Sequence, residues 1–523
     1  MPELGMKKRR KSHLVWFVLV LLAAGMACQL TSPRPASWAG TPTAEARLTQ
    51  VAQTQAVMRS ESDYVFTPTI PTIVPESTPT PTVSPTPPIE ADGPWLLFTE
   101  PNGTWLMAYD VQAKVTHKID LPEPIIAADL ASGYAPDGKA LFIRAGSAMN
   151  TEELALYQIN LPSREDSING FEVSRVSSLL SISLQRQIVN QEGTRALEAL
   201  SAVTRPDGLA WSPDGRFLAF TAALNNETSD LYIFDTLNDQ INRANRYLTH
   251  NASPLWSPDS TWLISQELEL NQFTEDWRAT NVVGLQMPGY INQDQVYSPP
   301  TGSREEIFVG WRNVETFISY SLTEDGPSQL RQVTYDRLRE SMIFDGSFKQ
   351  VAFDPASGVF AFIISHNNTI AQEISGGLYR LLPDSTTLHL QQGGYWDNLT
   401  WDPSGMFVAA GIRGILLFTP DGDSMVLPGQ GNARISPNGN WLIAWGDGEN
   451  SASGARLYQS ASDHPLQTLL EGPVEALFWQ PDSRGFFIQS EGALYHFVFP
   501  GLKPLEISND LSLDSALEWL WVE

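Results

Sequence analysis

Histidine is the side chain that most often binds a transition metal or acts as a general base near neutral pH. No two of the seven histidines form the His-x-x-x-His pair that would place two imidazoles on one face of a helix. They are scattered along the chain, at His13, His117, His250, His366, His389, His464 and His496. This spacing argues against a metal-dependent hydrolase, and the sequence predicts neither a metal site nor a cofactor.

Nucleophile and phosphate-binding motifs are also missing from the sequence. There is no Gly-x-Ser-x-Gly elbow to present a reactive serine and no Gly-x-x-x-x-Gly-Lys loop to cradle a phosphate. Cys28 is the one cysteine, so the chain can form no internal disulfide and no multi-thiolate metal site. Because no catalytic constellation is found, the sequence predicts a protein that is not an enzyme.

Acidic residues suggest two further kinds of chemistry, calcium binding and glycoside hydrolysis. Segments 421–423 (DGD) and 447–450 (DGEN) carry oxygen ligands but lack the alternating spacing of a calcium-binding loop, so solvated turns are the favoured interpretation. Glycosidases use paired carboxylates. Asp214, Asp259 and Asp482 instead occupy the same place in one repeated turn, which favours a structural role for each.

That turn belongs to a unit repeated along the chain. In its best copy, Leu209–Trp211 leads into Ser212-Pro213-Asp214-Gly215, and a second apolar segment follows. Proline presets the first corner of a type I turn, Asp bonds to nearby backbone amides, and Gly relieves crowding at the exit. The unit therefore predicts a β-hairpin, with Asp230–Asp235 as a third strand and Arg246–Thr249 as a fourth.

Related turns recur at intervals that fit a propeller. The residues predicted to form them are Pro136, Asp137, Pro213, Asp214, Pro258, Asp259, Pro355, Pro403, Pro437, Pro481 and Asp482. Successive motif prolines are 77, 45, 97, 48, 34 and 44 residues apart, and one four-stranded blade needs roughly 40 to 50 residues. The interval of 97 holds a degenerate copy at 308–313 with a strand at 316–320. The interval of 77 holds an inserted, partly helical loop or, alternatively, another blade.

The two ends of this domain complement each other. Segments 95–98 and 105–109 look like later strands of a blade, whereas 516–522 looks like a first strand. Pairing the ends would complete one blade and close the ring, which removes open strand edges. The predicted fold class is all-β, a single β-propeller of about eight four-stranded blades, with seven or nine as alternatives. The tryptophans expected to pack between blades are Trp211, Trp256, Trp401 and Trp479.

In the best copy of the unit, a Trp-Ser-Pro-Asp-Gly turn is followed by a strand and then by Asp-Leu-Tyr-Ile. This order resembles the repeat of the TolB-like, WD-repeat-like propellers, and the resemblance covers about residues 93–523. The motif is a structural element and carries no chemistry. The sequence departs from it at Trp311-Arg312-Asn313 and in the first blade, which affects the blade count. The resemblance implies a propeller that recognises a protein in the periplasm or at the cell surface.

Residues 1–27 have the organisation of an export signal. Residues 7–11 are basic, 14–27 form an apolar run, and Gly25-Met26-Ala27 precedes Cys28. This arrangement resembles a bacterial lipoprotein signal, although Gly25 stands where that family usually has Leu. The resemblance implies cleavage before Cys28 and lipid attachment to it. An ordinary signal cleaved nearby and an uncleaved anchor are the alternatives, and all three place the rest of the chain outside the cytoplasm.

The segment that follows cannot build a core. Residues 28–92 are rich in Thr, Pro, Ser and Ala, with proline tracts at 67–69 and 77–82. Proline restricts φ and lacks a backbone donor, so a disordered, extended tether is predicted. The predicted domains are thus a signal peptide at 1–27, a tether at 28–92 and the propeller at 93–523.

Net charge narrows the choice of partners. The formal charge is −26, and removing the first 27 residues, which carry a net +4, leaves −30. Such a surface repels phosphate backbones, so nucleic acid is not an expected partner. The predicted function is an extracytoplasmic, membrane-anchored, non-catalytic binding or scaffold module for an unknown protein or cell-envelope polymer, with unknown ligand-binding residues. The alternatives are a glycan-active or other hydrolytic propeller with acids such as Asp421 or Glu449 at the channel mouth, and a passive spacer.

Overall fold

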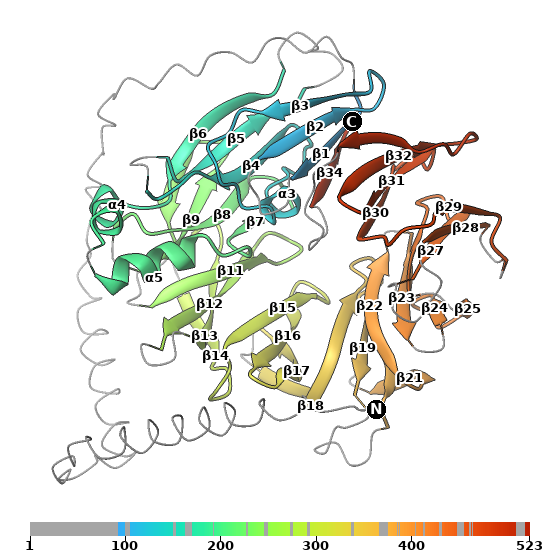
Figure 1. Cartoon of the computed structure of the whole chain (residues 1–523). Coiled ribbons are helices and arrows are strands. Elements are labelled where there is room, and N and C mark those ends of the chain that lie inside the picture. The colour runs from blue at the N-terminus through green and yellow to red at the C-terminus, as the bar shows by residue number, and fades with distance from the viewer. Residues whose placement is uncertain are drawn as a thin grey trace, which may run out of the picture. The chain divides into compact units, whose positions relative to one another are not determined.

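The computed structural model describes most of the chain beyond residue 92 (Figure 1). The described residues are 93–523 except 100–104, 150–152, 163–169, 192, 226–227, 245–248, 272–275, 290–292, 336–338, 366–374, 384, 386, 403, 412–413, 428–430, 447–453, 460–461, 463 and 509–517. Cys28 and the predicted signal peptide and tether lie outside them, as do Pro403 and Glu449. Within the described ranges, no helix is long and apolar enough to cross a membrane.

The two ends of the described chain meet in one sheet. Strand β34 (Trp519–Val522) pairs antiparallel with β1 (Trp95–Thr99), so that Trp95 lies opposite Val522. Strands β2 (Leu106–Asp110) and β3 (Val115–Ile119) complete the order β34-β1-β2-β3. The first strand of this blade therefore comes from the C-terminal end of the chain, and the other three come from its N-terminal part.

Five sheets are the four-stranded antiparallel meanders that the repeat predicts. Their strands are β7 (Leu209–Trp211), β8 (Phe217–Ala222), β9 (Asp230–Asp235) and β10 (Gln240–Arg243); β11 (His250–Trp256), β12 (Trp262–Leu270), β13 (Trp277–Gln286) and β14 (Gln293–Tyr297); β22 (Trp396–Asp402), β23 (Met406–Gly411), β24 (Gly414–Phe418) and β25 (Ser424–Leu427); β26 (Asn432–Ile435), β27 (Trp441–Trp445), β28 (Ala455–Gln459) and β29 (Gln467–Leu470); and β30 (Ala476–Trp479), β31 (Gly485–Ser490), β32 (Ala493–Val498) and β33 (Leu505–Ser508). Each sheet begins with the strand that precedes the repeated turn.

A seven-stranded sheet contains two blades joined by one long strand. Its strands are β15 (Glu305–Trp311), β16 (Thr316–Thr323), β17 (Gly326–Thr334), β18 (Arg339–Phe353), β19 (Phe360–Ile364), β20 (Gly377–Leu381) and β21 (Leu388–Gly393). The first part of β18 pairs with β17, and its last part, from Phe348, pairs with β19. The long interval between motif prolines therefore does hold the degenerate blade predicted there.

The long interval between Pro136 and Pro213 holds an insertion. Strands β4 (Ala140–Ala145), β5 (Ala155–Asn160) and β6 (Glu172–Ser178) form a three-stranded sheet, and a bridge from Tyr134 to Leu141 marks the place of its first strand. Helix α3 (Asp129–Ser132) precedes this blade. Helices α4 (Ile182–Val189) and α5 (Thr194–Val203) follow it, which confirms the partly helical loop.

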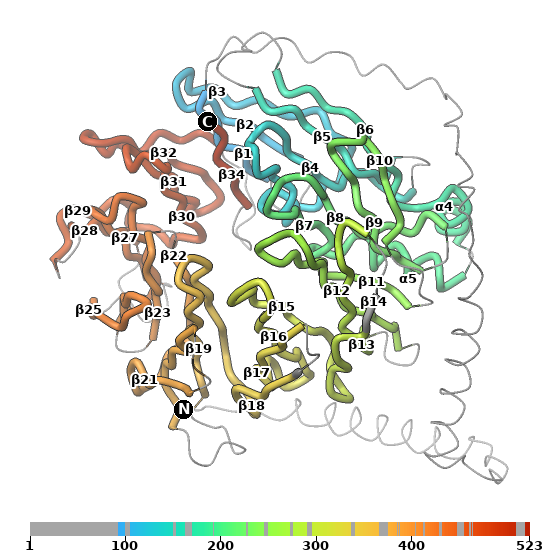
Figure 2. Tube along the Cα trace, turned by 180° about the vertical axis from the view of Figure 1, so that it is seen from behind, coloured from blue at the N-terminus to red at the C-terminus, as the bar shows by residue number. Residues whose placement is uncertain are grey.

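The predicted fold, an all-β propeller of about eight blades with seven or nine as alternatives, is observed. The strands form eight sheets among the described residues, and dividing the seven-stranded one at β18 gives nine blade repeats. We number them in chain order. Blade 1 is β34-β1-β2-β3, blade 2 is β4 to β6, blade 3 is β7 to β10 and blade 4 is β11 to β14. Blade 5 is β15 to the first part of β18, blade 6 is the last part of β18 to β21, blade 7 is β22 to β25, blade 8 is β26 to β29 and blade 9 is β30 to β33. Figures 1 and 2 show the first strands, such as β7, β15, β22, β30 and β34, toward the middle of the arrangement.

Apolar cores lie between consecutive blades. Phe407 and Phe418 of blade 7, for example, pack with Ala361 and Ile363 of blade 6. The last interface joins blade 9 to blade 1, through Phe487 among others. Burying a large apolar side chain contributes about 1.5–3 kcal/mol, so these interfaces are the main stabilising element of the domain.

The fourth strand of blade 3 differs from the prediction. Strand β10 (Gln240–Arg243) returns directly after β9, whereas the sequence predicted this strand at Arg246–Thr249. The reason is the turn at Asp235, whose carboxylate accepts hydrogen bonds from Leu237 N at 3.1 Å and Asn238 Nδ2 at 2.8 Å. These bonds reverse the chain earlier than predicted, and residues 245–248 lie outside the described ranges.

Candidate functional site

The repeated Asp residues bond to their own turns. Asp214 Oδ1 accepts from the Ser212 hydroxyl at 2.6 Å and from Arg216 N at 3.1 Å, and Ser212 Oγ accepts from Phe217 N at 2.8 Å. Asp259 repeats the pattern with the Ser257 hydroxyl at 2.6 Å. Asp137 and Asp482 each accept from the backbone amide two residues later. The prolines that the structure describes at these turns are Pro136, Pro213, Pro258, Pro355, Pro437 and Pro481.

Neighbouring turns are also tied to each other. Where Ser replaces the turn Gly, its hydroxyl accepts a bond from the preceding blade: Ser260 Oγ from Asp214 N and Ser483 Oγ from Asn438 N, both at 3.1 Å. The indole of Trp256 donates to Ala210 O at 3.0 Å, again across a blade interface. These groups hold neighbouring blades together.

The histidines do not assemble a metal centre in the part of the chain that the structure describes, where no group of three or more His, Cys, Asp or Glu is suited to hold an ion. Burial lowers the pKa of His250 to about 4, and burial, with a contribution from Lys114, does the same for the pKa of His496. His496 lies between the Tyr109 hydroxyl at 3.2 Å and Gln480 Nε2 at 2.9 Å. Both are neutral imidazoles within the propeller at neutral pH.

Asp421 does not lie where the hydrolytic alternative needs it. It is an exposed residue in the turn between β24 and β25, the third and fourth strands of blade 7, and this turn closes with a bond from Gly422 N to Thr419 O at 2.9 Å. Figures 1 and 2 show first strands toward the middle of the arrangement, whereas the turn with Asp421 joins the last two strands of its blade. Glu449 lies outside the described residues.

Two other acids do converge at the first strands. We call Arg205, Asp207, Ser253 and Glu305 the arginine–acid cluster. Arg205 donates to both oxygens of Asp207 at 3.1 Å and also pairs with Glu305, and the Ser253 hydroxyl bonds to Asp207. The cluster spans blades 3, 4 and 5, because Arg205 and Asp207 precede β7, Ser253 lies on β11 and Glu305 starts β15.

The two carboxyls of the arginine–acid cluster have opposite pKa shifts. Burial acts to raise the pKa of Asp207, but the charge and hydrogen bonds of Arg205 and the bond from Ser253 outweigh it, so the pKa is lowered. Burial raises the pKa of Glu305, and the nearby Asp207 charge adds to the effect, although Arg205 opposes it. Carboxyl pairs with diverging pKa values can act as acid and base.

The contacts of the arginine–acid cluster nevertheless continue into the structure. Gln266 Nε2 donates to Ser253 Oγ at 2.6 Å, and Gln266 Oε1 accepts from Glu306 N at 2.9 Å. His250, on the same strand as Ser253, bonds to Ser229 rather than to the acids. The arrangement therefore links three blades through hydrogen bonds.

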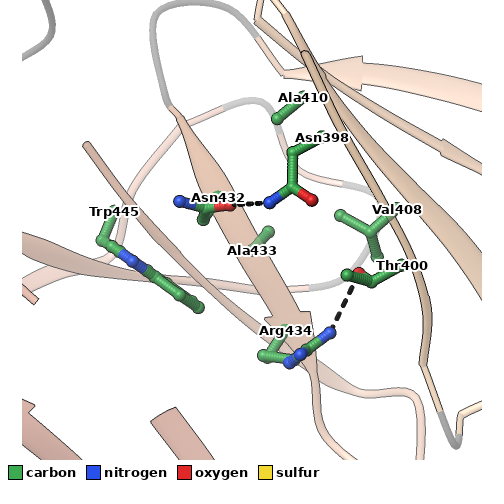
Figure 3. A pocket seen from close by; sticks show the side chains of 8 residues that line it. All are labelled: Asn398, Thr400, Val408, Ala410, Asn432, Ala433, Arg434 and Trp445. Carbon is green, nitrogen blue, oxygen red and sulfur yellow. Dashed lines mark hydrogen bonds between the residues drawn. The ribbon is translucent and has the colours of Figure 1, made fainter. Parts of the chain in front are cut away.

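A hollow of about 280 Å³, including its part open to solvent, lies between blades 7 and 8 (Figure 3). We call it the Arg434 hollow. One wall comes from β22 and β23, where Asn398 pairs with Ala410 and Thr400 with Val408. The other comes from β26 and β27. Its lining residues are Asn398, Thr400, Val408, Ala410, Asn432, Ala433, Arg434 and Trp445.

Alternation along the two first strands puts their polar side chains on facing walls. Asn398 Nδ2 donates to Asn432 Oδ1 at 2.8 Å, and Arg434 Nη1 donates to Thr400 Oγ1 at 3.0 Å. Among the described residues, the Arg434 guanidinium has no other hydrogen-bond partner and no ion pair. A guanidinium has five N–H donors, so most of its bonding capacity is left for a ligand.

Sequence reasoning did not single out the residues of this hollow. Their signal is a pair of polar side chains two residues apart just before the turn, Asn398 with Thr400 and Asn432 with Arg434. The best copy of the repeat has apolar residues in this stretch, at Leu209 and Ala210. These polar residues distinguish two neighbouring blades in the sequence. The sequence does not show that their side chains meet across the interface between the blades.

No family model matches the sequence, and no curated protein matches it. Solved structures similar to this chain include a eukaryotic initiation factor, at 13% identity with a TM-score of 0.49, covering 82% of this chain and 98% of that one. An oligogalacturonate lyase in complex with manganese has 14% identity and a TM-score of 0.33, covering 56% and 88%. TolB from Acinetobacter baumannii has 13% identity and a TM-score of 0.27, covering 73% and 82%. These matches carry no conclusion about function, and the propeller architecture rests on the strand pairing itself.

Proposed function

We propose that this protein is an extracytoplasmic, membrane-tethered propeller that binds a protein or a cell-envelope polymer without transforming it. The observation that carries the proposal is the Arg434 hollow, where a guanidinium faces a polar recess between two first strands and has one neutral partner among the described residues. A few polar groups converging in a recess with apolar walls are typical of a binding site. The export signal and tether predicted from residues 1–92 support the location.

Binding is tested by immobilising the full chain and exposing it to an envelope extract of the source organism. We expect a component that is retained in a saturable way, is displaced by soluble full chain, and is recovered with unchanged mass. If the soluble chain displaces no retained component from the immobilised chain in repeated extracts, the proposed binding function is wrong.

The second candidate is a hydrolytic propeller, and the diverging pKa shifts of Asp207 and Glu305 are the observation that favours it. Its test is the mass of the captured component. A shortened product that disappears with Asp207→Asn or Glu305→Gln would support hydrolysis, whereas a shortened product that persists with both variants would exclude these acids as catalysts.

The tether is tested separately from binding. We expect Cys28→Ser to move the protein from the membrane fraction to the soluble fraction, because the lipid attachment site is lost. Retention in the membrane after this change would instead favour an uncleaved anchor. Ser37→Ala, a change of a nearby tether residue, is the matched control and should leave the protein membrane-bound.

A further inference from the structure

The Arg434 hollow carries an inference about the chemistry of the ligand, which rests on the proposed binding function. Several arginines of the propeller pair with carboxylates. Arg144 pairs with Asp129 at 2.7 Å, Arg243 with Asp230 at 2.7 Å and Arg331 with Glu306 at 2.9 Å. Arg434 differs from these three arginines, because its one hydrogen-bond partner among the described residues is the neutral hydroxyl of Thr400.

The charge and donors of the Arg434 hollow fit a small anion. Arg434 supplies a positive charge with planar donors, and its one side-chain hydrogen bond among the described residues is to the Thr400 hydroxyl. The Asn432 side chain uses its oxygen to accept from Asn398, which leaves its NH₂ group as a further donor on the same strand face. A guanidinium binds a carboxylate through two parallel N–H···O bonds, so a carboxylate matches this donor set.

The rest of the recess favours a peptide as the source of that carboxylate. The Asn398 and Asn432 amides can exchange hydrogen bonds with a peptide group, which has one donor and one acceptor. Val408 and Ala410 of β23 form an apolar wall beside them that fits a small apolar side chain. A sugar acid would place several hydroxyls against this wall without partners, which is unfavourable.

We infer that the Arg434 hollow binds the terminal carboxylate of a peptide, with Arg434 holding the carboxylate, the two asparagines holding the last peptide group and the Val408 wall contacting the last side chain. Thr400 orients the guanidinium through its hydroxyl. Thr400 is therefore a positioning residue, and Arg434 is the group that touches the ligand.

The test is calorimetric titration of the full chain at low ionic strength with N-acetyl-dialanine, which has a free carboxylate, and with its C-terminal amide. We expect the acid to bind at least about tenfold more tightly than the amide, because a hydrogen bond to a charged group contributes about 1.5–3 kcal/mol. Arg434→Gln should remove this difference. Arg434→Lys should retain part of it, since lysine keeps the charge without the planar donors.

Arg484→Gln is the matched control, because it removes the same charge from a side chain that is 84% exposed. It should leave the preference for the acid unchanged. If Arg434→Gln does not fold, Thr400→Val gives a second variant, for which we expect about a threefold loss in affinity for the acid and none for the amide.

Three results would overturn the inference. They are equal binding of the acid and the amide, an equal loss with Arg484→Gln, and tighter binding of glucuronate than of N-acetyl-dialanine. An envelope component captured by wild type and by Arg434→Gln alike would show that the protein binds elsewhere, so the inference would fail while the binding function stands.

Discussion

The arginine–acid cluster and the Arg434 hollow both lie along first strands of consecutive blades, yet they use an arginine in opposite ways. Arg205 lies between Asp207 and Glu305, and Asp207 also accepts a bond from Ser253 of blade 4. Arg434 bonds to a neutral hydroxyl and faces a recess. An arginine beside a first strand can therefore hold blades together or stay available for a ligand, depending on whether neighbouring blades supply carboxylates.

Removing the guanidinium of Arg205 should have the largest effect on stability. We expect Arg205→Gln to lower the free energy of unfolding by about 3 kcal/mol, because two half-buried carboxylates would lose their counter-charge. Urea unfolding followed by tryptophan fluorescence measures the change. Adding Glu305→Gln should recover part of the loss, and an additive loss in the double variant would contradict the coupling.

Acidification should lower the free energy of unfolding through His250, which lies on the same strand as Ser253 of the arginine–acid cluster. The pKa of His250 is about 4 in the folded protein, against about 6.5 in an unfolded chain. The unfolded state therefore takes up a proton that the folded state does not, so stability is present above pH 6.5 and is lost as the pH falls toward 4. We expect a loss of about 2 kcal/mol between pH 7 and 5.

Melting temperature measured against pH tests this expectation. His250→Gln should flatten the slope between pH 7 and 5, and His389→Gln, a change of an exposed residue on β21, should not. Buried His496 contributes a slope of its own, so the flattening should be partial. An unchanged slope in the His250 variant would show that this histidine is protonated in the folded state.

The repeated turns should contribute less than the charged cluster. We expect Asp214→Ala to cost about 1 kcal/mol, since it removes the acceptor of the Ser212 hydroxyl and of Arg216 N. Ligand capture should be unaffected. Asp421→Ala, in an exposed turn away from the first strands, should change stability by less than about 0.5 kcal/mol. Loss of capture without a change in melting would contradict the structural role of Asp214.

Arg434→Gln should have the smallest effect on stability, within about 0.5 kcal/mol, because its one partner among the described residues is a hydroxyl and no buried acid is left unpaired. The same urea titration used for Arg205→Gln measures it. If Arg434→Gln lowered the free energy of unfolding as much as Arg205→Gln does, the two regions would not differ in this respect. Arg434 would then have a structural role.

Much of the fold could be predicted because the residues of each repeat determine its turn and its hairpin locally. Ser212-Pro213-Asp214-Gly215 contains every group that closes the turn, so the hairpin is local. The helical insertion was predictable for the same reason, from apolar residues at helical spacing in 194–203. The fourth strand of blade 3 was placed too late, because the bonds of the Asp235 carboxylate to the residues after it were not recognised.

The Arg434 hollow could not be predicted from the sequence, although its polar residues can be identified there. Asn398 and Asn432 are 34 residues apart, and their bond exists because two first strands lie face to face across a blade interface. Asp207 and Glu305 are similarly remote in sequence, and the acid proposed instead, Asp421, lies in an outer turn. Which side chains meet depends on the angle and register between blades, which no single repeat specifies.

The strand repeat and the turns follow from the sequence alone, because they depend on short-range backbone preferences and on alternating apolar residues. The pairing of residues 95–98 with 519–522 was predictable because each segment lacks the strands that the other supplies. That Arg205 meets two carboxylates and Arg434 meets a hydroxyl follows only from the arrangement of the blades. A charge is neutralised by what lies near it in space, and in a propeller those neighbours belong to the next blade.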